Sequence, residues 1–260
     1  MGQLIVAGFH RSGTSLLTQV LHAGGLFVGD RLLGAAPSNP YGHFEDLEVL
    51  NLHRAILGAH DDAPGDAWHW DEPTAFHLSS AHWASMRRLV AKRDAAHETW
   101  GFKDPRVCLF LGAWKYVMPD AKVVVVYRDP GECVRSMESR QGGELVRGVG
   151  IARNQTFFTR PDHGLKIWDT YNRALLAFAE AHVEDCLVLP FTALTGGFPV
   201  IERVNARLDI GLDTVDTASV FDALATSRRD AAQRVHSDVV RRRVEETWER
   251  LESLSERTAA

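Results

Sequence analysis

The sequence predicts a single three-layer α/β domain, in which helices flank both faces of a central and mostly parallel sheet. Short apolar runs alternate along the chain with segments whose apolar residues recur at helical spacing. One run, residues 122–127, contains four consecutive valines, as is typical of a strand covered on both faces. A glycine-containing loop joins the first predicted strand to the first predicted helix, which makes the expected fold P-loop-like.

Composition fits one domain over residues 1–260 and narrows the possible functions. The chain is 45% hydrophobic and 24% charged, which is ordinary for a protein with a substantial core. Its net charge of −5 argues against a nucleic-acid partner. No apolar stretch approaches the roughly 20 residues of a transmembrane helix, and no leader segment is recognisable, so a cytoplasmic location is expected. The three widely spaced cysteines, Cys108, Cys133 and Cys186, are expected to be buried, reduced thiols.

The first half of the chain contains two predicted strands. A strand is expected over residues 3–7, followed after the loop by a helix over residues 14–23. A second helix is predicted for residues 45–57, with acidic residues at its start. A third helix follows, with Leu78, Met86, Leu89 and Val90 on one face. The second strand is expected over residues 99–103, and Pro105 is suited to begin the next helix.

The second half begins with the valine-rich strand, from which a helix is expected to run to about Gln141. The next segment, residues 142–162, contains four glycines and no clear period, and it is predicted to be a mobile loop. A helix over residues 165–181 and a fourth strand over residues 187–189 follow. An amphipathic helix over about residues 236–254 is expected to end the chain.

The loop after the first strand, residues 8–15, has the composition of an anion site. Backbone N–H groups at a strand-to-helix turn, together with the positive end of the helix, favour a phosphate or sulfate. The spacing nearly matches G-x-x-x-x-G-K-[ST], but Thr14 stands where nucleoside-triphosphate chemistry needs lysine. Arg11 supplies a charge from another position. The expected anion-binding residues are His10 (through its backbone amide), Arg11, Ser12, Gly13, Thr14 and Ser15.

Arg128 directly follows the valine-rich strand, and Ser136 comes eight residues later. Ligands bind open α/β sheets at the carboxyl edge of the strands, where Arg128 is expected to lie. Ser136, two turns into the following helix, is positioned to donate to the same phosphate.

These two segments resemble those of the sulfotransferase family that uses 3′-phosphoadenosine-5′-phosphosulfate (PAPS). The loop is similar to the family's 5′-phosphosulfate loop, and Arg128 with Ser136 is similar to its 3′-phosphate segment. The resemblance implies transfer of a sulfuryl group to a hydroxyl or amine, with 3′-phosphoadenosine-5′-phosphate (PAP) as the product and no metal cofactor. Such a transfer depends mainly on positioning and electrostatics.

Two further segments indicate residues for the chemistry. Residues 39–46 resemble the N-P-x-G-x-F-E segment of many bacterial members of the family, which makes Glu45 the leading general base and His43 its alternative. Residues 100–106 are similar to the Lys-Asp-Pro segment of the tyrosylprotein branch. Lys103 is therefore expected to neutralise charge on the departing oxygen together with Arg11.

Several alternatives remain open at this stage. A nucleotide-dependent kinase with a degenerate loop and a non-catalytic PAP- or PAPS-binding protein are the competing functions. The acceptor, whether a small molecule, a glycan or a lipid headgroup, is expected to lie among residues 24–43, 60–73 and 142–162. The sequence does not settle whether Arg228 or Arg229 reaches the nucleotide, nor what the oligomeric state is.

Overall fold

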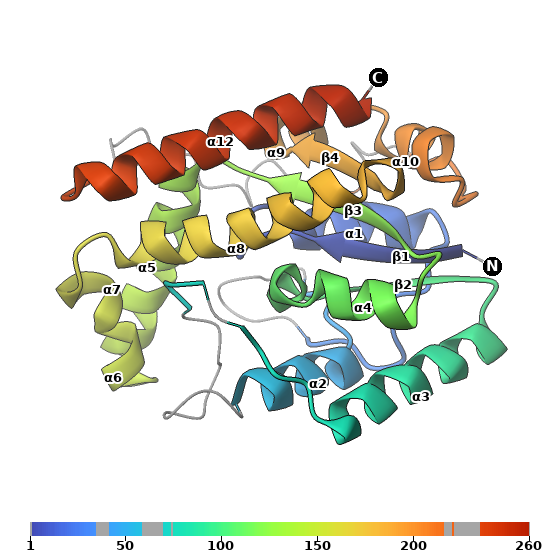
Figure 1. The fold of residues 1–260 in the computed structure, drawn as a ribbon, viewed down its shortest axis with the longest axis horizontal. Coiled ribbons are helices and arrows are strands. Elements are labelled where there is room, and N and C mark those ends of the chain that lie inside the picture. Colours follow the sequence, from blue (N-terminus) through green and yellow to red (C-terminus); the bar gives the residue numbers. More distant parts are fainter. Residues whose placement is uncertain are drawn as a thin grey trace.

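A computed structural model of the chain describes residues 2–34, 42–58, 70–73, 75–215, 220 and 235–259. Four strands form one sheet in the order β2-β1-β3-β4, and every pairing is parallel (Figure 1). The strands are β1 (Gly2–Ala7), β2 (Thr99–Lys103), β3 (Lys122–Tyr127) and β4 (Cys186–Pro190). The predicted three-layer α/β fold is confirmed, and all four predicted strands are present.

Alternate residues of the strands contribute to two separate hydrophobic cores, because successive side chains point to opposite faces of a sheet. One core contains Ile5, Ala7, Val123, Val125, Cys186 and Val188. The other contains Leu4, Val6, Val124, Val126, Leu187 and Leu189. The four valines are thus fully buried, as the uninterrupted apolar run predicted.

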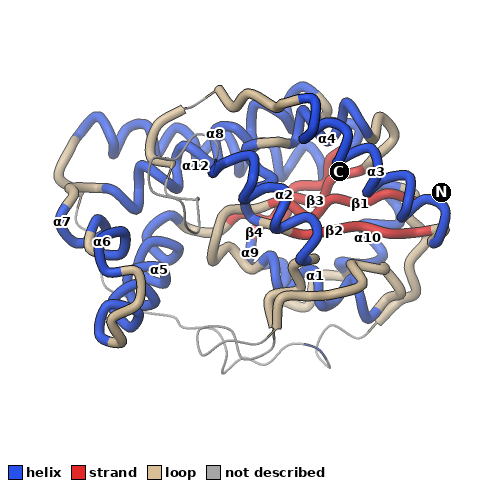
Figure 2. The backbone as a smooth tube through the Cα atoms, turned by 90° about the horizontal axis from the view of Figure 1, so that it is seen from below, coloured by secondary structure: helices blue, strands red, loops and turns tan. Residues whose placement is uncertain are grey.

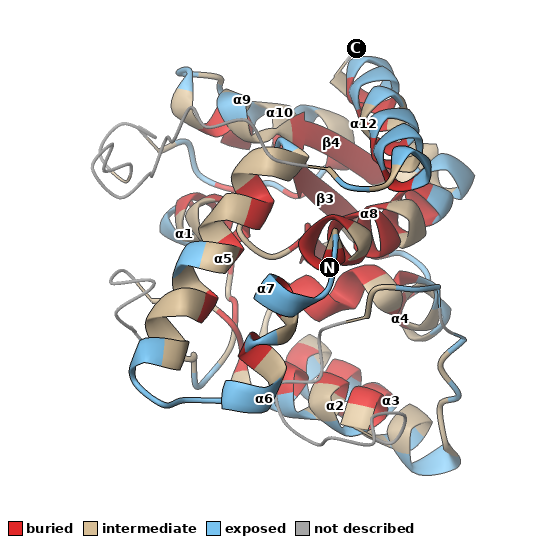
Figure 3. Ribbon diagram, turned by 90° about the vertical axis from the view of Figure 1, so that its left-hand side faces the viewer, coloured by how far each residue is buried: buried red, intermediate tan, exposed pale blue. Residues whose placement is uncertain are grey.

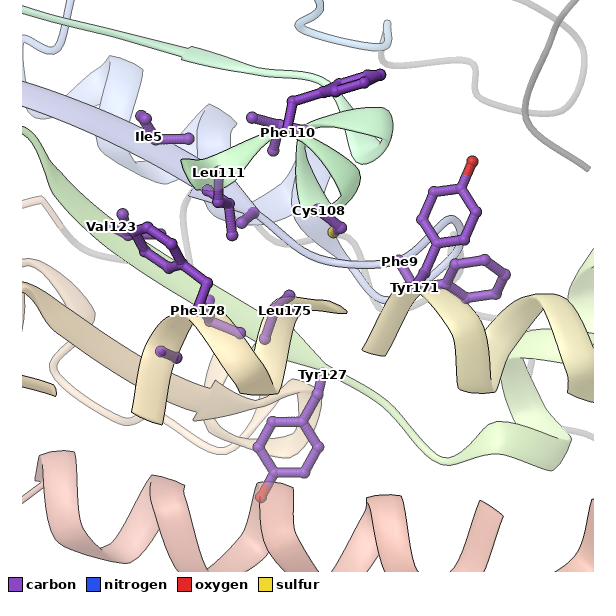
Figure 4. Packing of buried hydrophobic residues seen from close by; sticks show 14 of the residues in the cluster. Ile5, Phe9, Cys108, Phe110, Leu111, Val123, Tyr127, Tyr171, Leu175 and Phe178 are labelled. Atoms are coloured by element: carbon purple, nitrogen blue, oxygen red, sulfur yellow. The ribbon is translucent and has the colours of Figure 1, made fainter. Parts of the chain in front are cut away.

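Helices cover both faces (Figure 2). The second core is closed by residues of α1 (Thr14–Ala23) and α10 (Val200–Leu208). The first core is larger, and its helices include α8 (His163–Ala181), whose Tyr171 lies beside Phe9 of the loop that follows β1 (Figure 4). The other long helices of this layer are α2 (Leu47–Gly58), α3 (Ser80–Ala96), α4 (Leu111–Val117), α5 (Pro130–Val146) and α12 (Asp238–Ala259).

The C-terminal helix α12 protects the edge of the sheet. The Val188 N–H of β4 donates to the Thr258 hydroxyl at 3.0 Å, and the Ser255 hydroxyl donates to the Val188 carbonyl at 2.9 Å. These side chains satisfy backbone groups that an edge strand would otherwise expose. The helix is also tied to α8, because Asp169 accepts from Thr247 at 2.7 Å.

The prediction that residues 142–162 form a mobile loop is wrong. Helix α5 continues to Val146, and two single-turn helices follow, α6 (Ile151–Asn154) and α7 (Thr156–Thr159). Glu144 stabilises both parts, since it pairs with Arg140 one turn earlier and accepts from Asn154 of α6. Long-range partners of this kind do not appear in a local apolar period.

Other boundaries differ from those predicted. Helix α2 begins at Leu47 rather than at Glu45, and the segment after Pro105 is the 3₁₀-helix η1 (Pro105–Leu109). The helices α9 (Phe191–Thr195) and α10 were not predicted, and a 3₁₀ turn, η2 (Val183–Asp185), precedes β4.

The three cysteines are free and buried, as predicted, and burial raises the pKa of each thiol to about 12. None of the described helices is long and apolar enough to cross a membrane.

Candidate active site

All four strands end at one edge of the sheet, and each is followed there by a residue of the candidate site. Arg11 lies in the loop after β1, Lys103 ends β2, Arg128 follows β3, and Phe191 follows β4. In the strand order β2-β1-β3-β4, the chain passes from β1 to β2 on one side and then returns to β3 on the other side of β1. The strand order therefore reverses between the neighbouring strands β1 and β3. Ligands of open α/β sheets bind at such a crossing point, and Arg11 and Arg128 lie on its two sides.

The backbone of the loop depends on two unusual conformations. Gly13 has a φ of 98°, and a Cβ atom at this position would come within 2.4 Å of the Phe191 ring. Arg11 has a φ of 67°, a left-handed conformation that few residues other than glycine adopt. Among the described residues, no side chain caps the N-terminus of α1 at Gly13, so its first N–H groups are suited to bind an anion.

The two predicted donor-binding segments are in direct contact although they are more than 100 residues apart. Arg11 Nε donates to Ser136 Oγ at 2.9 Å, and Arg128 Nη1 approaches the Arg11 carbonyl oxygen at 3.4 Å. Arg128 is held in turn by Glu132, at 2.7 Å from Nε. Burial lowers the pKa of Arg11, and the nearby Arg140 lowers it further. Positive charge is therefore concentrated where an anion could stabilise it.

Phe191 belongs to this site and was missed by the sequence reasoning. The Arg128 guanidinium lies 4.3 Å from the centre of its ring, and the Cδ2 and Cε2 edge of the ring lies next to Gly13. The only signal in the sequence was an aromatic residue directly after the fourth predicted strand.

Lys103 and Glu45 form a buried ion pair next to the loop. Lys103 Nζ lies 2.7 Å from Glu45 Oε1, and both side chains are less than a tenth exposed. Lys103 also donates to Ser15 Oγ at 3.3 Å and to the His43 carbonyl at 3.2 Å. Glu45 is thus not the first acidic residue of a helix, but the partner of the lysine that was expected to act beside it.

The two histidines of the site have lowered pKa values. Burial is the largest cause for His43; the negative charge of Glu45 opposes it, and the positive charges of Lys103, Arg140 and Arg11 add to it. His10 is half-buried, packs edge-on against Phe9 and Tyr171, and has a pKa well below the usual range, chiefly because of its burial. Both imidazoles are therefore neutral near pH 7.

A second buried polar network begins at Asp104, the residue after Lys103, and the sequence analysis did not predict it. Asp104 accepts from His53 Nδ1 at 3.1 Å and from Arg106 Nη1 at 3.0 Å. Trp114 Nε1 donates to His53 Nε2 at 2.8 Å, which fixes the ring proton on Nδ1. Burial alone would raise the pKa of Asp104, but Arg106 and His53 outweigh burial and hold this pKa well below its ordinary value.

The remaining predicted residues make contacts within the protein. The Ser12 hydroxyl lies against Cys133 Sγ, Thr14 is buried beside Gly8, and Ser15 donates to the His43 carbonyl at 3.2 Å. Asp46 caps α2 through the Glu48 N–H and also pairs with the buried Arg93. Asn39, Pro40, Tyr41, Arg228 and Arg229 lie outside the described residues. Within the described part of the chain, no group of three or more potential ligands is arranged to hold a metal ion.

Taken together, the fold and the site define an α/β protein whose strand–loop–helix turn carries groups suited to an anionic ligand. A family model described as "Sulfotransferase family" matches residues 3–210, which is most of the chain. The chain belongs to the sulfotransferase family.

Solved structures agree with this assignment at the level of the fold. The sulfotransferase domain of the Synechococcus PCC 7002 olefin synthase is 15% identical, with a TM-score of 0.53, covering 96% of this chain and 94% of that one. The sulfotransferase domain of the curacin biosynthetic pathway is 12% identical, with a TM-score of 0.50 and coverages of 88% and 81%. A search of curated proteins found no match.

Proposed function

We propose that this sulfotransferase uses PAPS as its donor and transfers the sulfuryl group to a hydroxyl or amine of its acceptor by in-line displacement. The observation that supports this most strongly is the contact between Arg11 and Ser136. It joins the loop expected to bind the 5′-phosphosulfate to the segment expected to bind the 3′-phosphate. PAPS carries a 5′-phosphosulfate and a 3′-phosphate on one nucleotide, so the neighbouring cations Arg11 and Arg128 are suited to bind both groups.

Within this proposal, the donor is bound by the loop and by β3. The N–H groups of α1 and the Arg11 guanidinium bind the phosphosulfate, while Arg128 and Ser136 bind the 3′-phosphate. Since no lysine follows Gly13, the loop lacks the cation that would favour binding of a β,γ-phosphate and magnesium.

Lys103 and Glu45 are proposed to perform the transfer. Lys103 neutralises the charge that develops on the bridging oxygen as the S–O bond of the donor breaks, which is electrostatic stabilisation of the transition state. Glu45 accepts the proton of the attacking acceptor group. The two groups pair with each other at 2.7 Å, so a bound donor would compete with Glu45 for the ammonium.

His43 remains the alternative base. Its lowered pKa keeps the imidazole neutral at pH 7 and able to accept a proton. The half-buried position of His43, two residues from Glu45, suits the same acceptor.

The donor half is tested by binding and turnover with purified protein. PAP at 100 times its dissociation constant should add about 2.7 kcal/mol to the free energy of unfolding. With PAPS labelled in its sulfuryl group, the label should be transferred to an acceptor without added divalent metal. A melting-temperature increase with Mg-ATP and none with PAP would indicate a kinase instead. Intact PAP binding without turnover on a broad panel would indicate a non-catalytic binding protein.

The base is assigned by two substitutions. Glu45→Gln keeps the size of the side chain and should lower turnover by about 10²-fold or more, while PAP binding is nearly unchanged. If turnover survives Glu45→Gln and is lost in His43→Ala, His43 is the base.

The reaction is proposed to occur in the cytoplasm, where the three free thiols would stay reduced.

A further inference from the structure

One face of α5 carries a row of polar residues that runs away from the proposed donor site. Glu132, Ser136, Arg140 and Glu144 are spaced four residues apart, so they share this face. Ser136 accepts from Arg11 at 2.9 Å, which shows that the row faces the loop after β1. With a rise of 1.5 Å per residue, Arg140 lies about 6 Å further along the helix than Ser136.

Arg140 lies within electrostatic reach of both sides of the site. Among the charged neighbours of Arg11, it makes the largest contribution to lowering the pKa of that guanidinium. It also lowers the pKa of His43 and that of His10. The loop after β1 also contacts His43, because Ser15 donates to the His43 carbonyl at 3.2 Å. Arg140, one turn beyond Ser136, and His43, two residues from the proposed base Glu45, therefore both lie near this loop, on the side where the acceptor is proposed to enter.

The Arg140 guanidinium is held in place but remains accessible. Its Nε donates to Glu144 Oε1 at 3.0 Å, and its side chain is 30% exposed. Glu144 Oε2 accepts from Asn154 Nδ2 at 3.0 Å, and Asn154 also donates to the Val149 carbonyl at 3.0 Å. This chain of bonds ties Arg140 to α6, which packs against α5 beside α7 (Figure 3).

This attachment leaves the outer edge of the guanidinium for a ligand. Arginine has five N–H donors, and Glu144 is the only partner of Arg140 within the described residues, through Nε. The two terminal nitrogens form a planar fork that matches a carboxylate or a phosphate. The donor has its own cations, Arg11 and Arg128, at the sheet edge.

We propose that Arg140 binds an anionic group of the acceptor, so that the substrate is an alcohol or amine that already carries a carboxylate or a phosphate. This inference rests on the proposed function, because Glu45 and the donor loop define which side is the acceptor side. Arg140 acts as a specificity-determining residue, and the Glu144–Asn154 chain positions it. The reaction that supplies this substrate must therefore install, or leave in place, an acidic group near the accepting hydroxyl or amine.

The test compares matched acceptors in a mass-spectrometric assay with PAPS. Each anionic member has a neutral counterpart: 4-hydroxyphenylacetate and its amide, glycerol 3-phosphate and glycerol, and N-acetylserine and N-acetylserinamide. The wild-type protein should prefer anionic members in kcat/KM, and Arg140→Met should lower that preference by roughly tenfold or more. Arg140→Lys keeps the charge and should restore part of it. Arg147→Met, an exposed arginine at the end of α5, is the matched control and should change nothing.

Two measurements separate this inference from the proposed function. PAP should raise the melting temperature of Arg140→Met as much as that of the wild type, because the donor site is intact. If PAP shifts neither protein and no product forms, the proposed function fails. Products formed equally well from neutral members, or an altered KM for PAPS in Arg140→Met, would overturn the inference alone.

If none of the matched acceptors is turned over, their binding still tests the role of Arg140. The anionic members should then further stabilise the PAP-bound wild type but not PAP-bound Arg140→Met, and equal stabilisation of the two would overturn the inference. An NMR titration provides a check that needs no acceptor. Removing the positive charge should raise the pKa of His43 in Arg140→Met, and an unchanged value would show that Arg140 does not face the acceptor space.

Discussion

Lys103 and Asp104 are neighbours at the end of β2, yet their side chains enter two different buried polar networks. Lys103 faces the loop that follows β1 and bonds to Glu45, Ser15 and the His43 carbonyl. Asp104 faces the core and bonds to His53 and Arg106. The opposite directions follow from the alternation of side chains along a strand.

The Asp104 and Lys103 networks differ in where their residues lie. The Asp104 network ends on Trp114, a core residue, and the side chains of Asp104, His53 and Trp114 are all fully buried. The Lys103 network consists of groups that line the candidate site. A buried ion pair stabilises a fold little, because desolvation offsets the attraction. We infer that the Asp104 network maintains the structure behind β2, whereas the Lys103–Glu45 pair is kept for function at the expense of stability.

The largest effect is expected from Asp104→Asn. This substitution removes the carboxylate that contacts the buried Arg106 guanidinium, and it should lower the free energy of unfolding by about 3–5 kcal/mol. Urea unfolding followed by circular dichroism measures the loss. Turnover per folded molecule should stay near the wild-type value. A stable Asp104→Asn protein with no turnover would make Asp104 part of the site and remove the contrast.

The second prediction concerns the double variant Lys103→Met, Glu45→Gln. Removing both charges avoids an unpaired ion, so the free energy of unfolding should be equal to that of the wild type or higher. Turnover should fall by roughly 10²–10³-fold, since a group that stabilises the transition state is lost. A double variant as unstable as Asp104→Asn would show that both networks are structural.

A smaller effect is expected from Trp114→Phe. It removes the N–H that donates to His53 Nε2, and an unsatisfied buried acceptor costs about 1–3 kcal/mol. The melting temperature and the urea midpoint should both decrease, while kcat for any accepted substrate stays the same. Lower kcat without lower stability would link the core network to the chemistry.

The smallest effect is a pH dependence. The pKa of Asp104 is lower in the folded protein than its usual value of 3.8, so its contribution to stability is complete above that value and is lost as the pH falls toward the folded pKa. The stability difference between the wild type and Asp104→Asn should therefore shrink below pH 3.8, by at most about 1.4 kcal/mol per pH unit. A difference that stays constant down to pH 2 would contradict this assignment.

Much of the fold was predictable because its signals are local. The valine run of β3 and the helical spacing of residues 14–23 both appear within a few residues, and both elements were located correctly. The single-turn helices α6 and α7 were not, because bonds such as that between Asn154 and Glu144 stabilise them from ten residues away. A glycine-rich composition alone predicted a loop there.

The sequence by itself determined the family, and it predicted a loop suited to an anion together with most of the charged residues of the candidate site. Most of these residues lie within a predicted strand or in the segment directly after it, so each motif can be recognised in a short stretch of sequence. Only the tertiary structure decided which charges meet: Arg11 with Ser136, Lys103 with Glu45, and Arg140 with Glu144 and Asn154. The physical reason is that a parallel sheet brings the carboxyl ends of strands far apart in sequence to one edge. Partners across that edge, such as Phe191 and Arg128, leave no mark on the sequence around either residue.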